Sequence, residues 1–147
     1  MSSIEETIKS LFSNKEDTKS IVFEWENGAA VIKTVGVNGL EDVKSALDST
    51  KVQLPIFAVQ SIDKDESVET QRTYFVQLPF VGENVKPLRR RDLGVLRNSI
   101  NSTIDNLKAG HIHVTMEITN VDEIRVEELE KRLLTACGSH KPKGFKW

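Results

Sequence analysis

Residues 71–105 read QRTYFVQLPFVGENVKPLRRRDLGVLRNSINSTID. This pattern predicts an apolar strand over residues 73–81, a turn at Gly82, a basic cluster and then a long amphipathic helix. The apolar positions of that helix recur at the spacing of one helical face and are Leu93, Leu96, Ile100, Ile104 and Leu107. A second strand is predicted over residues 112–118. The strand, helix and strand should therefore form a right-handed crossover with a parallel strand pair.

Three consecutive arginines, Arg89, Arg90 and Arg91, stand where the predicted long helix begins. A helix N-terminus carries a partial positive charge and favours acidic side chains, so each exposed arginine there costs roughly some tenths of a kcal/mol. Folding alone does not favour this placement, and we interpret the cluster as a surface for an acidic partner. The alternative is a solvated loop whose arginines form ion pairs with Asp92 or with the acidic segment 63–69.

The N-terminal part of the chain predicts a helix followed by a hairpin. Residues 4–12 have the apolar spacing of an amphipathic helix. Strands are predicted over residues 20–26 and 29–37, and Asn27 and Gly28 between them form the dipeptide most typical of a tight hairpin turn. The first two strands are therefore expected to pair antiparallel.

A short helix and a long strand are predicted between the hairpin and the opening stretch. Asn38 is expected to cap the short helix. The apolar run over residues 51–62 predicts a central strand buried on both faces, with a bulge or a strand start at Pro55. Residues 63–70, DKDESVET, are expected to form an acidic hairpin loop.

The C-terminal part of the chain completes the predicted architecture. Gly110 is expected to end the long helix, and Asn120 or Asp122 to cap the last one. Together the elements predict an α/β (α+β) domain over residues 1–138, with a central mixed five-stranded sheet and helices on both faces. Residues 139–147 are expected to form a basic, flexible tail, whose Phe145 and Trp147 either pack on the core or contact a partner.

Length and composition fit an ordinary globular protein of 147 residues with one domain. The formal net charge of −2 provides no global field that would attract nucleic acid. The single cysteine, Cys137, excludes an intramolecular disulfide and fits a reducing compartment. Because the sequence has no signal-like or membrane-spanning apolar run, we expect a cytoplasmic protein with no membrane partner.

Candidate catalytic and metal-ligating groups are sparse. His111, His113 and Glu117 share one face of a predicted strand, but two histidines without a cysteine cluster make a weak metal site, and a polar outward face is favoured. Cys137 has only His140 nearby as a base, so a structural role is favoured. We therefore predict a protein that is not an enzyme and that holds no metal and no cofactor.

The segment FVQLPFVGENV, residues 75–85, resembles the strand and turn of coactosin, a branch of the actin-depolymerising-factor homology (ADF-H) family. The predicted order of elements is similar to that of this family over nearly the whole chain. The resemblance implies an ADF-H/cofilin-like fold and a non-enzymatic actin-binding module. In the coactosin pattern, a lysine just before the apolar strand contacts the filament. Tyr74 stands at that position here, with Arg72 two residues earlier.

The resemblance implies binding to the side of actin filaments, by a monomer in the actin cytoskeleton. The predicted binding surface consists of Arg72, Tyr74, Lys86, Arg89, Arg90, Arg91, Arg97 and Lys131. One alternative is a remodeller similar to cofilin or glia maturation factor, which binds monomeric actin or a branch complex. Cofilins use a basic start of the long helix for this purpose. Another alternative is an ADF-H scaffold that has lost actin binding.

Overall fold

The computed structural model describes residues 3–13, 17–65, 68–70, 72–138 and 141–147. The helices are α1 Ile4–Ser13, α2 Leu40–Ala46, α3 Asp92–Leu107 and α4 Val126–Ala136, with 3-10 turns η1 Pro87–Arg89 and η2 Val121–Glu123. The strands are β1 Ser20–Glu26, β2 Ala29–Gly36, β3 Val52–Asp65, β4 Val68–Thr70, β5 Thr73–Gln77, β6 Phe80–Val81, β7 Val114–Thr115 and β8 Gly144–Lys146.

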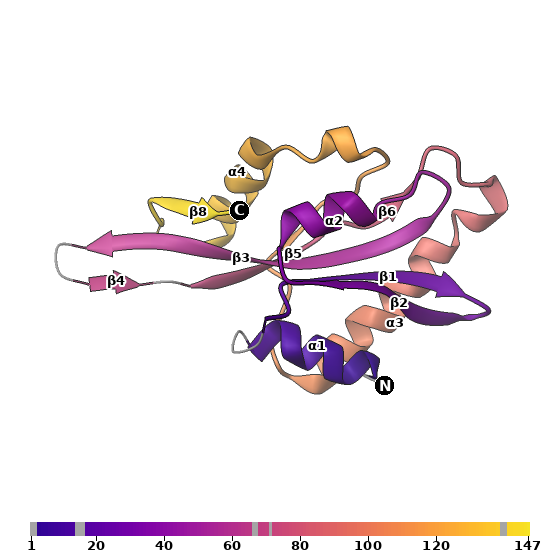
Figure 1. Cartoon of the computed structure of the whole chain (residues 1–147), viewed down its shortest axis with the longest axis horizontal. Coiled ribbons are helices and arrows are strands. Elements are labelled where there is room, and N and C mark those ends of the chain that lie inside the picture. The colour runs from indigo at the N-terminus through magenta and orange to yellow at the C-terminus, as the bar shows by residue number, and fades with distance from the viewer. Residues whose placement is uncertain (1–2, 14–16, 66–67, 71, 139–140) are drawn as a thin grey trace.

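The strands of the described residues form one mixed sheet around β3 (Figure 1). The main path runs β2-β1-β3-β5-β7, and the short strands β4, β6 and β8 also pair with β3. Strands β5 and β7 are parallel, with Val76 opposite Val114, and the other pairs of named strands are antiparallel. The five strands of the main path and the parallel pair across α3 confirm the predicted topology.

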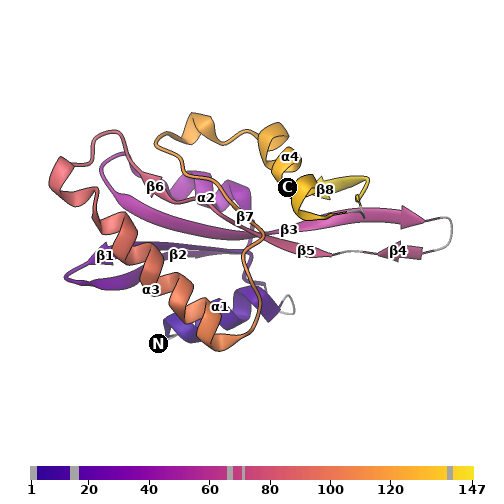
Figure 2. The same cartoon turned by 180° about the vertical axis from the view of Figure 1, so that it is seen from behind.

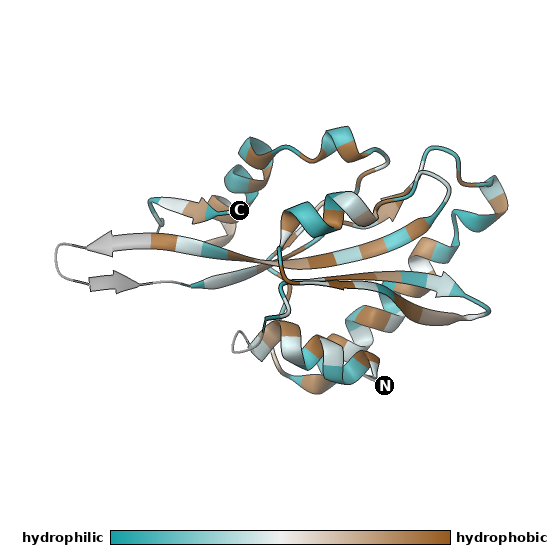
Figure 3. Cartoon of the chain, viewed as in Figure 1, coloured by the Kyte–Doolittle hydropathy of each residue, from teal (hydrophilic) through white to brown (hydrophobic). Residues whose placement is uncertain are grey.

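Helices cover both faces of the sheet, as predicted (Figures 1 and 2). Helices α1 and α3 lie on one face and α2 and α4 on the other. The first core contains Ile8, Leu11 and Phe12 of α1 and Leu96, Ile100 and Ile104 of α3. The second contains Leu40 and Val43 of α2 and Leu129 and Leu133 of α4. Figure 3 shows the resulting separation, with hydrophobic residues along the sheet and a largely hydrophilic segment where α3 begins.

The hairpin turn between β1 and β2 forms as the sequence predicts. Asn27 and Gly28 both adopt positive φ, of 52° and 77°. A turn with two left-handed residues matches the twist of the strands that it joins. Asn and Gly tolerate that conformation better than other residues, which explains why this dipeptide was a reliable signal.

The central strand β3 is longer and more regular than predicted. Pro55 lies inside it without a bulge, opposite Val22 of β1. The Pro55 carbonyl accepts a hydrogen bond from Leu78 N, which lies in the break between β5 and β6. Because the nitrogen and the carbonyl of a strand residue point to the same side, the missing N–H of Pro55 also faces this break. The expected acidic loop is largely strand, because β3 runs to Asp65 and β4 begins at Val68. Residues 66–67 of that prediction lie outside the described residues.

The predicted helix ends are displaced. Gly39, not Asn38, is the N-cap of α2, and the Asn38 N–H donates to Asp42 Oδ2. At the end of α3 the left-handed residue is Lys108, with φ of 53°, rather than Gly110. Asn120 caps the 3-10 turn η2 by accepting a hydrogen bond from Asp122 N, and α4 begins later.

The C-terminal segment differs from the predicted flexible tail. Residues 139–140 lie outside the described residues, whereas residues 144–146 form β8 and pair antiparallel with β3. Phe145 is buried in the α2–α4 core, and Trp147 Nε1 donates to Glu130 Oε1 at 2.9 Å. The two aromatic side chains therefore pack back on the domain, which was one of the two outcomes expected from the sequence.

Candidate functional site

The loop that leads into α3 is held against the loop before β3. Gly82 N donates to the Lys51 carbonyl at 3.1 Å, and Asn84 N donates to the Ser49 carbonyl at 2.8 Å. A Cβ atom on Gly82 would lie 2.1 Å from the Ser49 oxygen, so only glycine permits this approach. Val85 is buried beside the α3 core. These contacts fix where the following basic residues emerge.

Lys86, Arg89, Arg90 and Arg91 form one exposed cluster, which we call the basic helix start. Lys86 and Arg90 flank the turn η1, and Arg91 is the N-cap of α3 without a side-chain capping bond. The structure thus confirms that the arginines lie at the N-terminus of the long helix. Their charges add to the positive end of a 16-residue helix dipole.

Ion pairs with the described residues neutralise only a small part of the charge of the basic helix start. Arg89 Nη1 lies 3.8 Å from Asp92 Oδ2, which is one of the ion pairs weighed from the sequence. Among the residues that the structure describes, Arg90, Arg91 and Lys86 form no ion pair within 4.0 Å. The cluster therefore has three cations directed at solvent.

Two exposed apolar side chains accompany these cations and were not among the predicted site residues. Leu88, within η1, is 77% exposed, and Val95, in the first turns of α3, is 46% exposed. Arginine is enriched in protein interfaces, and exposed apolar side chains close to it in the chain add surface that a partner can bury. The only sequence signal was that neither residue fits the apolar face of the long helix.

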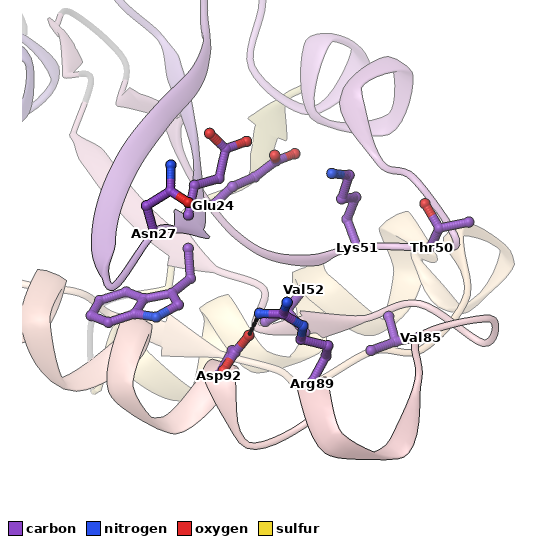
Figure 4. A pocket seen from close by; sticks show the side chains of 10 residues that line it. Glu24, Asn27, Thr50, Lys51, Val52, Val85, Arg89 and Asp92 are labelled. Atoms are coloured by element: carbon purple, nitrogen blue, oxygen red, sulfur yellow. Dashed lines mark ion pairs between the residues drawn. The ribbon is translucent and has the colours of Figure 1, made fainter.

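A hollow of about 390 Å³ opens beside the basic helix start (Figure 4). It lies between the β1–β2 turn, the loop before β3 and the start of α3, and Arg89 and Asp92 lie on one wall. Its deepest carboxylate, Glu24, is 3% exposed and accepts a hydrogen bond from Gln53 Nε2 at 2.9 Å. Lys33 Nζ lies 3.8 Å from Glu24 Oε2. The hollow has mixed charge and can accept a polar side chain of a docked protein.

The structure does not bring the other predicted residues into this cluster. Arg97 lies further along α3 and forms an ion pair with Glu117 at 3.0 Å. Arg72 is exposed just before β5, and β5 and α3 begin toward opposite ends of the long axis (Figure 1). Lys131 is exposed on α4, across the sheet from α3. The eight predicted residues therefore form one cluster of four and separate positions around it.

Tyr74 was predicted to lie on the binding surface, but the structure places it in the core. Its side chain is 7% exposed, and its ring meets Phe145 and His113 edge-on, with centroid distances of 6.3 and 5.0 Å. Burial raises the pKa of the Tyr74 hydroxyl, and a hydrogen bond with Cys137 raises that pKa further. The period-two pattern placed Tyr74 on one face of the strand, but that face is covered by α4 and β8.

His113 also departs from the predicted outward face. Its ring is half-buried, and Nδ1 accepts a hydrogen bond from Phe75 N at 3.0 Å. Burial lowers the pKa of His113 to about 4, and the neighbouring His111 lowers it as well. Within the described residues, no group of three or more His, Cys, Asp or Glu side chains is arranged to hold a metal ion. None of the described helices has the length and apolar composition needed to cross a membrane.

The fold and the sequence identify the family. A sequence model of cofilin/tropomyosin-type actin-binding proteins matches residues 1–134. The chain belongs to this family. It is 27% identical to coactosin of Entamoeba histolytica over 127 residues, which cover 84% of this chain and 80% of the relative.

Solved structures of coactosins have the same fold as this ADF-H domain. The crystal structure of Entamoeba histolytica coactosin superposes with a TM-score of 0.71 at 21% identity, covering 90% of this chain and 91% of the other. Human coactosin-like protein gives a TM-score of 0.70 at 12% identity, covering 88% and 92%. Mouse coactosin, described as an actin filament binding protein, gives 0.64 at 13% identity, covering 88% and 84%. The predicted coactosin resemblance and fold class are confirmed.

Proposed function

We propose that this ADF-H domain binds the side of actin filaments through the basic helix start, without enzymatic activity. The observation that carries the proposal is the set of cations Lys86, Arg90 and Arg91, which form no ion pair with any residue that the structure describes and which lie close in the chain to the exposed Leu88. Folding gains nothing from this arrangement, because like charges meet the positive end of a helix. Membership of an actin-binding family and the likeness to mouse coactosin support the choice of partner.

The proposed mechanism is electrostatic docking followed by local contacts. The guanidinium groups of Arg90 and Arg91 would bind carboxylates of the filament, with the two-pronged geometry that arginine permits. Leu88 would enter an apolar recess and exclude water from these pairs. Because exposed charges do most of the steering, affinity should fall as salt concentration rises. The domain would act as a monomer in the cytoplasm, at the actin cytoskeleton.

The remaining predicted residues have smaller proposed roles. Arg97 would act beside the cluster only if it exchanged Glu117 for a partner carboxylate. Arg72 and Lys131, which are exposed elsewhere, would contribute only to a second contact with the filament. Tyr74 would support the fold under β8 rather than touch the partner.

The same cluster is also compatible with a remodeller that binds monomeric actin, because cofilins use a basic start of the long helix. An ADF-H scaffold without actin binding is the remaining alternative. Cosedimentation with actin filaments over a salt series distinguishes these functions. We expect the protein in the pellet at low salt and its progressive loss as salt rises. Absence from the pellet at low salt would refute filament binding.

A parallel assay with monomeric actin completes the test. Gel filtration of the protein with actin held in its monomeric form should show no stable complex, and filaments incubated with the protein should keep their length under the microscope. A monomer complex, or shortened filaments, would instead establish the remodeller. Absence of binding to both forms of actin would refute the proposed function and leave two alternatives, the scaffold and a remodeller of the branch complex, which a pull-down with that complex separates.

A further inference from the structure

A second hollow, of about 490 Å³, lies on the α2–α4 face of the sheet. It lies at the point along β3 where pairing with β1 ends and pairing with β8 begins. Ala58 N donates to the Lys19 carbonyl at the start of β1, whereas Gln60 pairs with Lys146 of β8. The hollow thus lies at the junction of β1 and β8, and residues of α2 and the first residue of α4 also line it. Figure 1 shows α2 and α4 on the same side of the sheet. Its lining is distinct from the basic helix start.

The floor of this junction hollow is formed by buried apolar side chains, and its edges carry exposed apolar side chains. Leu40 and Val59 in the lining are 5% and 2% exposed. Val37 and Trp147, which also line it, are 65% and 38% exposed. The Trp147 indole is held by its hydrogen bond to Glu130. An aromatic side chain and a valine therefore flank a recess whose volume lies in the range of pockets that bind small ligands or parts of peptides.

The charged groups around the junction hollow are mainly positive. Lys19, Lys44 and Lys146 line it, against a single carboxylate from Glu41. Among the described residues, neither Lys44 nor Lys146 forms an ion pair within 4.0 Å. These lysines come from α2 and β8, so two separate elements contribute lysines to the lining of one recess.

We propose that the junction hollow docks an acidic peptide segment of a partner protein. One apolar side chain of the segment lies between Val37 and Trp147, and flanking carboxylates face Lys44 and Lys146. Charge complementarity favours an acidic occupant. The recess is concave, which disfavours a flat anionic membrane. Single ammonium groups separated by apolar surface suit carboxylates on an extended peptide, one at each side of the buried side chain.

The fluorescence of Trp147 provides a direct test in the full chain. The chain contains two tryptophans, so a Trp25→Phe background leaves Trp147 as the only one. The probe is a capped pentapeptide in which one leucine is flanked on each side by two glutamates. We expect a saturable change in emission at low salt. A matched peptide with glycine in place of leucine should bind more weakly, and one with lysines in place of glutamates should not bind.

Substitutions in the same background locate the binding. Lys44→Gln and Lys146→Gln should each weaken binding about threefold, and together about tenfold, as expected for exposed charge pairs. Val37→Asp, at a mostly exposed position, should abolish binding without unfolding the domain. The control Lys9→Gln, on α1 and across the sheet, should bind like the parent.

Three results would overturn the proposal. These are no saturable change with the acidic peptide, binding by the Lys44→Gln and Lys146→Gln variants that is as tight as binding by the parent, and equal binding of the leucine and glycine peptides. Phosphatidylcholine vesicles containing phosphatidylserine provide the competing occupant. If these vesicles shift Trp147 emission and the peptide does not, the hollow is a lipid-contact surface and the peptide assignment is wrong.

Discussion

Replacing Arg89, Arg90 and Arg91 together by alanine should weaken actin binding while leaving the domain as stable as before. Arg90 and Arg91 have no ion pair to lose within the described molecule, and Arg89 has only the 3.8 Å contact with Asp92. If each arginine contributes about 0.5–1 kcal/mol at the interface, the triple variant loses roughly tenfold to a hundredfold in affinity.

The effect of this variant on stability should be small, because loss of Arg90 and Arg91 stabilises the domain whereas loss of Arg89 destabilises it. Removing Arg90 and Arg91 relieves their repulsion with the N-terminus of α3, worth about 0.3 kcal/mol each. Removing Arg89 gives up one exposed ion pair worth less than about 1 kcal/mol. The free energy of unfolding should therefore change by no more than about 0.5 kcal/mol in total.

Cosedimentation titrations and urea unfolding of the same preparations measure both quantities. The matched control replaces Lys9, Arg125 and Lys143 by alanine, which removes the same charge from exposed positions outside the basic helix start. That control should bind within about twofold of the parent, apart from the long-range effect of net charge. If the arginine variant folds and binds as well as the control, the assignment of the surface is wrong.

Three further predictions test the structure around the site. Gly82→Ala should cost at least about 2 kcal/mol of unfolding free energy, because its Cβ would lie 2.1 Å from the Ser49 oxygen, whereas Gly94→Ala on α3, with open space around it, should be neutral or stabilising. Equal effects in urea unfolding would refute this close approach. Phe145→Ala should cost about 3 kcal/mol and increase hydrogen exchange at Lys143, whose N–H donates to the Ile62 carbonyl of β3 just before β8 begins, and an unchanged exchange rate would contradict the packing of β8. The unfolding free energy should rise with pH between about 4 and 6.5, because neutral His113 is the form that the fold retains and the unfolded chain binds the proton first. His113→Gln should flatten that rise, and an undiminished slope in this variant would assign it to other groups.

Strong local signals accounted for the elements that the sequence predicted well. The left-handed turn at Asn27 and Gly28 and the apolar face of α3 each depend on residues close together in the chain. The order of strand, long helix and strand then predicted a right-handed crossover with parallel strands, and β5 and β7 are parallel. The coactosin-like segment 75–85 and the family that it indicated agree with the whole-chain match.

The errors arose where a distant segment decides the environment. Tyr74 and His113 stand at positions that the alternating pattern assigns to the surface. However, β8 and α4 cover Tyr74, and the His113 ring accepts a hydrogen bond from a backbone N–H. Pro55 does not break β3, because the neighbouring strand is itself interrupted opposite it. The C-terminal segment looked mobile by composition, and its Phe145 is buried only because β3 extends beyond β1 and leaves an edge for it to pair with.

The sequence by itself determined that four arginine or lysine side chains stand at the start of a long helix, because helix periodicity and the Gly82 turn are encoded locally. The tertiary structure decided which charges are available to a partner. It pairs Arg97 with Glu117 and separates Arg72 and Lys131 from the cluster, and within its described part it leaves Arg90 and Arg91 without an ion pair. Charge is a property of a residue, whereas its neutralisation and burial depend on neighbours that the chain brings together only on folding.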